Sequence, residues 1–126
     1  MNRLEHLELA RRFLEEAKGY IGKGDPIQAS EKLYKVAEEA LKCLSAKYAV
    51  ETSDEASKRG RWTTPLLFKA AETIAEKLGG NVRRYWNTAW TLHVEGFHEA
   101  TLDVAYVARN MEDIEELVRL AEKEET

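Results

Sequence analysis

The residues best suited to chemistry lie together in the second half of the chain. Residues 83–100 read RRYWNTAWTLHVEGFHEA and contain two arginines, two of the chain's three tryptophans and two of its three histidines. A histidine can exchange a proton near neutral pH, and an arginine can hold a phosphate. This stretch is therefore a catalytic site, a binding groove, or a well-packed helix of the core.

Four aromatic residues of this stretch are spaced for one helix face. Trp86, Trp90, His93 and Phe97 follow one another at steps of four, three and four residues. Side chains at such steps share one side of an α-helix. Either this side is buried, in the core or at a dimer interface, or it forms the floor of a ligand groove. We favour burial, and keep Trp86 and Trp90 as candidate ligand-binding residues under the second interpretation.

Four residues of the stretch are candidates for catalysis. His93 and His98 could act as general acid–base groups, and Arg83 and Arg84 could steady a phosphate. Arg84 precedes His93 by nine residues, and at about 100° per residue nine steps turn the two side chains to opposite sides of a straight helix. One chain cannot then bring them together, although two chains of a dimer could. The spacing favours histidines that are hydrogen-bonded within the fold, with catalysis as the alternative.

Metal ligation has little support in the sequence. Glu95 and His98 are three residues apart and could share a metal ion, but no third ligand accompanies them. Cys43 is the only cysteine, which excludes an intramolecular disulfide and a cysteine-cluster zinc site. No glycine-rich phosphate loop and no Ser-His-Asp set is present. We expect no metal ion and no cofactor.

A second candidate site is basic. Lys58, Arg59 and Arg61 form the densest basic run of the chain, and Trp62 follows it directly. Lysine and arginine can hold phosphates while a tryptophan stacks on a base, so the run could bind RNA, and the arginines of residues 83–100 could extend it. We favour the alternative of an exposed loop whose tryptophan packs back on the helices. The net charge of -4 argues against a surface coated for nucleic acid.

Apolar residues recur every three or four positions through most of the chain, which predicts helices. Asp25 followed by Pro26 is typical of a helix start, and Thr64, as the cap, followed by Pro65 predicts another. Leu4 opens the core-facing side of the first helix. The predicted helices cover residues 2–22, 26–48, 64–78, 81–95 and 98–109, with a last helix beginning at Asn110.

Other segments interrupt this pattern. Residues 51–62 have no apolar periodicity and should form an exposed connection, and Gly96 should bend or break the chain. No segment alternates with a period of two, so no strand is predicted. The expected fold is all-α, an antiparallel four-helix bundle with one or two additional C-terminal helices, in a single domain over residues 1–126.

The sequence carries no sign of a membrane segment. Its first residues are charged throughout and lack the apolar run of a signal peptide. No window approaches the roughly 18 apolar residues of a membrane span. We therefore expect a cytoplasmic protein without membrane contact, and a lone cysteine suits that reducing compartment.

Two stretches resemble a known family. ASEKLYKVAEEALKCL, after a Gly-Asp turn, and AWTLHVEGFHEA, after a third helix, are similar to the archaeal PaREP family, which belongs with the HEPN-type helical bundles. The resemblance covers roughly residues 4 to 120. It implies a HEPN-like bundle that forms a homodimer and works with RNA or with a nucleotidyltransferase.

The resemblance also bears on catalysis. HEPN ribonucleases carry an arginine followed by a histidine roughly four to six residues later. No arginine precedes His93 or His98 at that distance, and the position six before His93 is Asn87. The resemblance therefore implies a non-catalytic binding or interaction module. The alternative is a metal-independent ribonuclease that uses a histidine and an arginine of residues 83–98.

Overall fold

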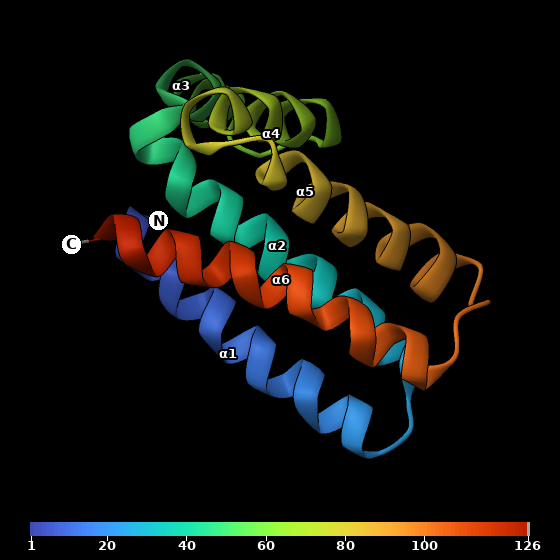
Figure 1. The fold of residues 1–126 in the computed structure, drawn as a ribbon. Coiled ribbons are helices and arrows are strands. Elements are labelled where there is room, and N and C mark those ends of the chain that lie inside the picture. The colour runs from blue at the N-terminus through green and yellow to red at the C-terminus, as the bar shows by residue number, and fades with distance from the viewer. Residues whose placement is uncertain (126) are drawn as a thin grey trace.

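The computed structural model describes residues 1–125, whose regular structure is helical (Figure 1). Its elements are α1 (Arg3–Gly22), α2 (Pro26–Tyr48), α3 (Val50–Arg59), α4 (Thr64–Leu78), α5 (Asn81–Thr91), the π-helical segment η1 (Leu92–His98) and α6 (Val104–Glu125). No β-strand occurs within residues 1–125. The all-α prediction is confirmed.

Helix α2 is the centre of the fold, because it packs against every other helical element. α1 and α6 pack against α2 and against each other, and α5 packs against α6. The continuous α5–η1 segment therefore runs alongside α2 and α6 (Figure 1). α3 lies at the opposite end of the molecule from η1, where α2 ends, and α4 packs against α5 (Figure 1).

Small residues on α2 and a large one on α5 fill the core. Ala37 and Ala40 of α2 are fully buried and allow neighbouring helices to approach closely. Trp86 of α5 is the largest fully buried side chain, with 1% of its surface exposed. Its ring contacts Tyr34 of α2 and Phe68 of α4, at centroid distances of 5.6 Å and 5.5 Å. Trp86 therefore fixes α5 against two other helices.

The starts of α2 and α4 follow the predicted chemistry. Asp25 accepts a hydrogen bond from the backbone N–H three residues on, at 3.1 Å, and Pro26 is the first helical residue. At α4 the cap is Thr63 rather than Thr64, because the Thr63 hydroxyl accepts from the backbone N–H of Leu66 at 3.4 Å. Two adjacent threonines offer the same capping group, so the sequence alone does not separate them.

The exposed connection predicted for residues 51–62 is wrong, because Val50–Arg59 form the helix α3. The buried residues of α3 are Thr52 and Ala56. These small side chains give no recognisable apolar periodicity, although their spacing of four places them on one side. Gly60 ends the helix with a φ of 76°, a left-handed conformation that favours glycine.

The prediction of two separate helices, one over residues 98–109 and one beginning at Asn110, is wrong. Residues 99–103 are not helical, and α6 then runs unbroken from Val104. Asp103 caps α6 by accepting from the backbone N–H of Tyr106 at 2.8 Å. Asn110 lies inside the helix, and its side-chain Nδ2 donates to the carbonyl of Tyr106 at 2.9 Å. The expected cap at Asn110 is therefore replaced by Asp103, a residue of equal capping ability.

Leu4 does not face the core as predicted. Its side chain is 50% exposed, and the buried residues of α1 begin at Leu7. Leu4 shares the apolar spacing of the helix, but it lies in the first turn, before the first buried residue.

Candidate functional site

The helix that carries the histidines does not bend or break at Gly96, contrary to the prediction, but widens into η1. The backbone N–H of Glu99 donates to the carbonyl of Val94, five residues earlier, at 2.8 Å. This is the hydrogen-bond pattern of a π-helix. Side chains five residues apart in an α-helix point about 140° away from each other. The wider turn of η1 instead brings His93 and His98 to one side, and π-turns of this kind are frequent at functional sites.

His93 and His98 form a hydrogen-bonded pair anchored by a carboxylate. The Nδ1 atom of His93 lies 3.0 Å from Oε1 of Glu31, and its Nε2 atom lies 3.2 Å from Nε2 of His98. Because a carboxylate accepts hydrogen bonds, the neutral form of His93 that fits this geometry carries its hydrogen on Nδ1 and accepts the Nε2–H of His98 at Nε2. The side chains of His93 and Glu31 are only 19% and 18% exposed, whereas His98 is exposed.

Aromatic rings hold His93 in place. Tyr34 of α2 stacks on the imidazole with a centroid distance of 4.1 Å and an angle of 21° between the rings. Trp90 lies 5.3 Å from the imidazole on the same measure, and Phe97 lies 6.4 Å away. These contacts restrict rotation of the imidazole. They keep its two nitrogen atoms directed at Glu31 and His98.

The side of α2 that faces η1 is acidic and partly removed from water. Burial, followed by the charges of Glu38 and Glu31, raises the pKa of Tyr34. Burial also raises the pKa of Glu38, an effect that Lys42 partly offsets. Carboxylates in such surroundings favour a cation beside them.

The close approach of η1 to α2 depends on Gly96. A Cβ atom at this position would lie 2.2 Å from the Oγ and 2.6 Å from the Cβ of Ser30. Ser30 is fully buried, and its hydroxyl has no hydrogen-bond partner among residues 1–125. Glu31 follows Ser30 on α2, so this contact sets the separation between Glu31 and His93.

The chain beyond His98 forms a strained and well-tied turn. Ala100 has a φ of 55°, in the left-handed region that residues with a Cβ rarely adopt. Thr101 ties the turn to η1, because its backbone N–H and its hydroxyl donate to the carbonyl of Glu95 at 2.8 Å and 3.1 Å. Such conformations persist only where the surroundings fix them, and they are frequent at functional sites.

Arg83 and Arg84 face away from the histidine pair. Arg83 donates to Glu72 of α4 from Nε and from Nη2, each at 2.8 Å, and these hydrogen bonds lower the pKa of Glu72. The Nη2 atom of Arg84 lies 3.7 Å from Oδ1 of Asp113 of α6. The four catalytic candidates therefore divide into two histidines that meet and two arginines that bind other partners.

The tryptophans of the same helix differ in exposure. Trp86 belongs to the core, whereas Trp90 is partly buried and packs edge-on against Phe68 at a centroid distance of 5.1 Å. The aromatic side of α5 is thus largely covered by residues of α2 and α4. Trp90 alone keeps a surface that a ligand could touch.

Part of the basic candidate site lines a groove. A hollow of about 600 Å³ opens between the start of α1, α2 and the turn between α3 and α4. This volume lies within the range of ligand pockets. Its basic and aromatic lining residues are Arg3, His6, Lys42, Arg61 and Trp62.

Lys58 and Arg59 stand beside this groove rather than in it. Both lie in the last turn of α3, where positive charge complements the negative end of the helix dipole. Arg59 is 3.6 Å from Glu55, on its own helix. Of the predicted basic run, only Arg61 lines the groove, together with Trp62.

Glu39 organises the floor of the groove. It accepts from Lys42 Nζ at 2.9 Å, and its other oxygen lies 2.8 Å from Nδ1 of His6. Burial alone would raise the pKa of Glu39, but the hydrogen bonds and charges of His6 and Lys42 outweigh burial and lower it. Glu39 therefore offsets part of the positive charge, whereas Arg61 has no ion-pair partner within residues 1–125 and keeps its charge for a ligand.

Several residues of both sites were not singled out from the sequence. Glu31, Tyr34 and Glu38 lie at steps of three and four, so an aromatic residue sits between two carboxylates on one side of α2. That pattern could have indicated partly buried carboxylates. Arg3 and Lys42, in contrast, join Trp62 only through the fold, and no local signal connects them.

Neither region forms a complete metal site or a membrane segment. Within residues 1–125, no group of three or more histidine, cysteine, aspartate or glutamate side chains is arranged to hold a metal ion. In the same part of the chain, no helix is both long and apolar enough to cross a membrane.

Known proteins resemble the chain in sequence and in fold. Residues 5–118 match the sequence model of the archaeal PaREP1/PaREP8 family. The crystal structure of a protein from Sulfolobus solfataricus is similar, with 40% identity, a TM-score of 0.85, and 91% of this chain and 94% of that chain covered. A solution structure of the same structural-genomics target has 41% identity and a TM-score of 0.78, with 89% and 87% covered. No curated protein matches the chain.

Proposed function

Because the chain belongs to the archaeal PaREP1/PaREP8 family, we propose that it acts as a single HEPN-like helical-bundle module that binds single-stranded RNA without cleaving it. The binding site is the groove beside Trp62. HEPN-type bundles, which the sequence resembles, include proteins that act on RNA, and this resemblance supports RNA as the ligand of the groove.

The observation that carries this proposal is the position of Arg61 next to Trp62 at the mouth of a groove that also contains Arg3 and Lys42. Arginine and lysine can contact successive phosphates, and a partly exposed indole can stack on a base. The four side chains come from α1, α2 and the turn after α3. Their convergence on one hollow is a feature of the fold, not of one basic stretch.

The overall charge limits how tightly such a groove can bind. The chain has a net charge of -4, so its overall charge does not attract phosphate, and only a few local contacts contribute. Each phosphate neutralised releases a counterion, so affinity should fall with salt. We expect binding at micromolar concentrations, with little preference for base sequence because phosphate contacts carry none.

The alternative function is a metal-independent ribonuclease. The hydrogen-bonded pair of His93 and His98 favours it, because a positioned histidine can move protons. The positions of the two arginines that would hold the phosphate argue against a ribonuclease, because Arg83 binds Glu72 and Arg84 faces Asp113. Incubating labelled single-stranded RNA with the purified chain separates the two functions. We expect bound but intact RNA, and cutting that is abolished by His93→Ala would establish the ribonuclease instead.

We also propose that the module is a homodimer, as the HEPN resemblance implies. The aromatic side of α5 adds no support for a dimer, because Trp86 is buried against Tyr34 and Phe68 of the same chain. Light scattering at high micromolar concentration should give about twice the chain mass of 14.4 kDa. A monomer at that concentration would reject the dimer. Should RNA not bind at low salt, a protein partner such as a nucleotidyltransferase becomes the better proposal.

A further inference from the structure

We propose that His93 and His98 form a two-histidine binding site for a divalent transition-metal ion of the Zn²⁺, Ni²⁺ and Cu²⁺ class. Their Nε2 atoms lie 3.2 Å apart. Two nitrogen ligands of a tetrahedral zinc ion, at bond lengths of about 2.0–2.1 Å, are separated by about 3.3–3.4 Å. Coordination therefore needs the two nitrogen atoms to separate by only a few tenths of an ångström. It also needs the exposed His98 ring to turn so that its Nε2 lone pair points at the ion.

The hydrogen-bond pattern gives His93 the form that a metal ligand needs. Its Nδ1–H is directed at Glu31, 3.0 Å away, so its Nε2 lone pair faces His98. A carboxylate behind a histidine is the common arrangement at metal sites, where it fixes the tautomer and strengthens the ligand. His98 becomes a ligand when its hydrogen moves from Nε2 to Nδ1, which changes neither its charge nor the number of protons bound.

The pair is held before any ion arrives. The π-turn of η1 places residues five apart on one side, and Tyr34 stacks on the His93 ring. Gly96 keeps η1 against α2, and the tied turn at Ala100 follows His98 directly. A site whose ligands need little reorganisation binds more tightly than a flexible one. Because His98 is exposed, an ion can reach the pair from water.

Protein ligands fill only part of the coordination sphere. Within residues 1–125 no third side chain completes a metal cluster, so water or another ligand takes the remaining positions. Imidazole is a good ligand for zinc, nickel and copper and a poor one for calcium or magnesium, which prefer oxygen. The inference goes beyond the proposed RNA binding, and η1 lies at the opposite end of the molecule from the start of α1, which lines the groove (Figure 1).

The test is a titration of the purified, tag-free chain with NiCl₂, followed by isothermal titration calorimetry and by tryptophan fluorescence. Trp90 lies 5.3 Å from His93 by ring centroids, so a bound paramagnetic ion should quench its emission. We expect saturable binding of one ion per chain. His98→Gln, at an exposed position, should weaken binding at least tenfold and reduce the quenching. Glu31→Gln should weaken it within the 10–100-fold range typical of such supporting carboxylates.

His6→Gln is the matched control. His6 is the only other histidine of the chain, and it lies in the groove beside Glu39. Its replacement should leave nickel affinity and quenching unchanged. The proposal is overturned if the unaltered chain shows no saturable binding, or if His98→Gln binds nickel as tightly as the unaltered chain. A loss of affinity in His6→Gln with none in His98→Gln would place the ion elsewhere.

Discussion

Gly96 lies against Ser30 so closely that a Cβ atom at Gly96 would fall 2.2 Å from the Ser30 Oγ. The contact joins η1 to α2 at the residue before Glu31, and therefore controls whether Glu31 can reach His93. Since the Cβ of Ser30 would also be only 2.6 Å away, rotation of the serine hydroxyl cannot relieve the clash.

Gly96→Ala should therefore lower the free energy of unfolding by about 1–3 kcal/mol, the usual cost of overpacking a core. Urea denaturation measures this directly. Gly19→Ala is the control, because Gly19 is also helical and a Cβ there meets nothing within 4 Å. That change should stabilise the fold by roughly 0.5–1 kcal/mol. Equal effects of the two substitutions would contradict the close approach of η1 to α2.

The two tryptophans of α5 should differ in their contribution to stability. Trp86→Ala removes a fully buried ring from between α2 and α4, and should cost about 3–5 kcal/mol. Trp90→Ala should cost less, because Trp90 is only partly buried. Trp86→Phe should be mild, since it keeps a ring and removes an indole N–H that has no partner within residues 1–125. Chemical denaturation of the three variants checks this order, and a larger cost at Trp90 would contradict it.

Glu38 and Glu39, adjacent residues of α2, should contribute to stability with opposite dependence on pH. The folded-state pKa of Glu39 is lowered, so its contribution to stability is present above the unfolded value near 4.5 and is lost as pH falls below it. The folded-state pKa of Glu38 is raised, so its contribution is present below that value and is lost as pH rises through the folded pKa.

Glu39→Gln should therefore destabilise the chain at pH 7, because His6 and Lys42 lose a charged partner. Glu38→Gln should stabilise it or leave it unchanged at the same pH. Thermal unfolding of both variants at about pH 4 and pH 7 tests this prediction. The melting temperatures of the two variants should lie closer together at the lower pH. If both substitutions changed stability in the same direction at pH 7, the opposite pKa shifts of Glu38 and Glu39 would be contradicted.

Much of the fold was predictable because its signals are local. Asp25 with Pro26 marks the start of α2 in the sequence as clearly as in the structure. α3 was missed because helix prediction depends on large apolar residues, and its buried residues are Thr52 and Ala56. The boundary of α6 was misplaced because Asp103 and Asn110 have equal capping chemistry, and only packing selects between them.

The sites were predictable only in part. The spacing of His93 and His98 excludes a common side in a regular α-helix, and the pair forms only because η1 is a π-helix. Such a widening has no sequence rule comparable to a helix cap. Glu31 and Lys42 are two of several charged residues of α2, all of which resemble surface positions in the sequence. Tertiary packing decides which of these charged residues face η1 and which face the groove.

Trp62 should contribute stacking to RNA binding. Trp62→Ala should weaken binding of a short single-stranded RNA by about 1–3 kcal/mol, the usual value for loss of one base–aromatic contact. Trp62→Phe should retain most of the affinity, because phenylalanine also offers a flat ring. Fluorescence anisotropy with a labelled oligonucleotide measures both. If alanine and phenylalanine weaken binding equally, the indole does not stack on a base.

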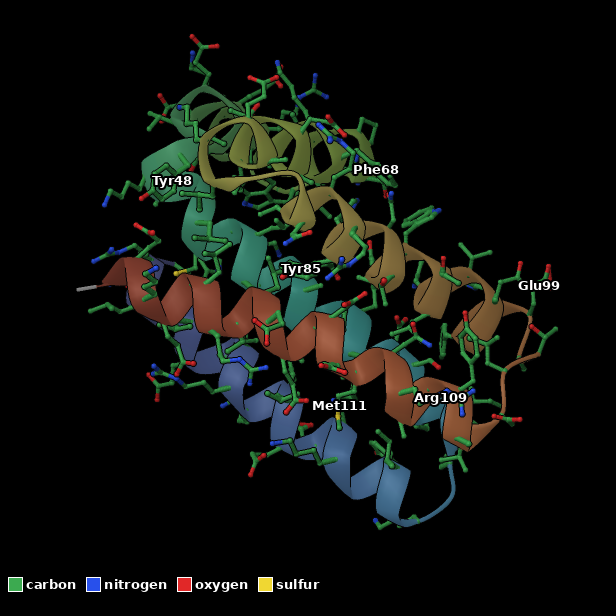
Figure 2. All side chains as sticks on the ribbon, in the orientation of Figure 1. Tyr48, Phe68, Tyr85, Glu99, Arg109 and Met111 are labelled. Atoms are coloured by element: carbon green, nitrogen blue, oxygen red, sulfur yellow. The ribbon has the colours of Figure 1, made fainter. Side chains whose placement is uncertain are left out.

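The most direct test of the proposed RNA binding in the groove compares two arginines. Arg61 lines the groove, whereas Arg109, an exposed residue of α6 labelled in Figure 2, lies at the other end of the molecule from the N-terminal end of α1. The measurement is the affinity for labelled single-stranded RNA as a function of salt, for the unaltered chain, Arg61→Ala and Arg109→Ala. Arg61→Ala should weaken binding and reduce the slope of log K against log salt by about 0.7, the loss of one phosphate contact. Arg109→Ala should change neither quantity. Indistinguishable curves for the two variants, or no RNA binding by the unaltered chain at low salt, would contradict the groove as an RNA-binding site.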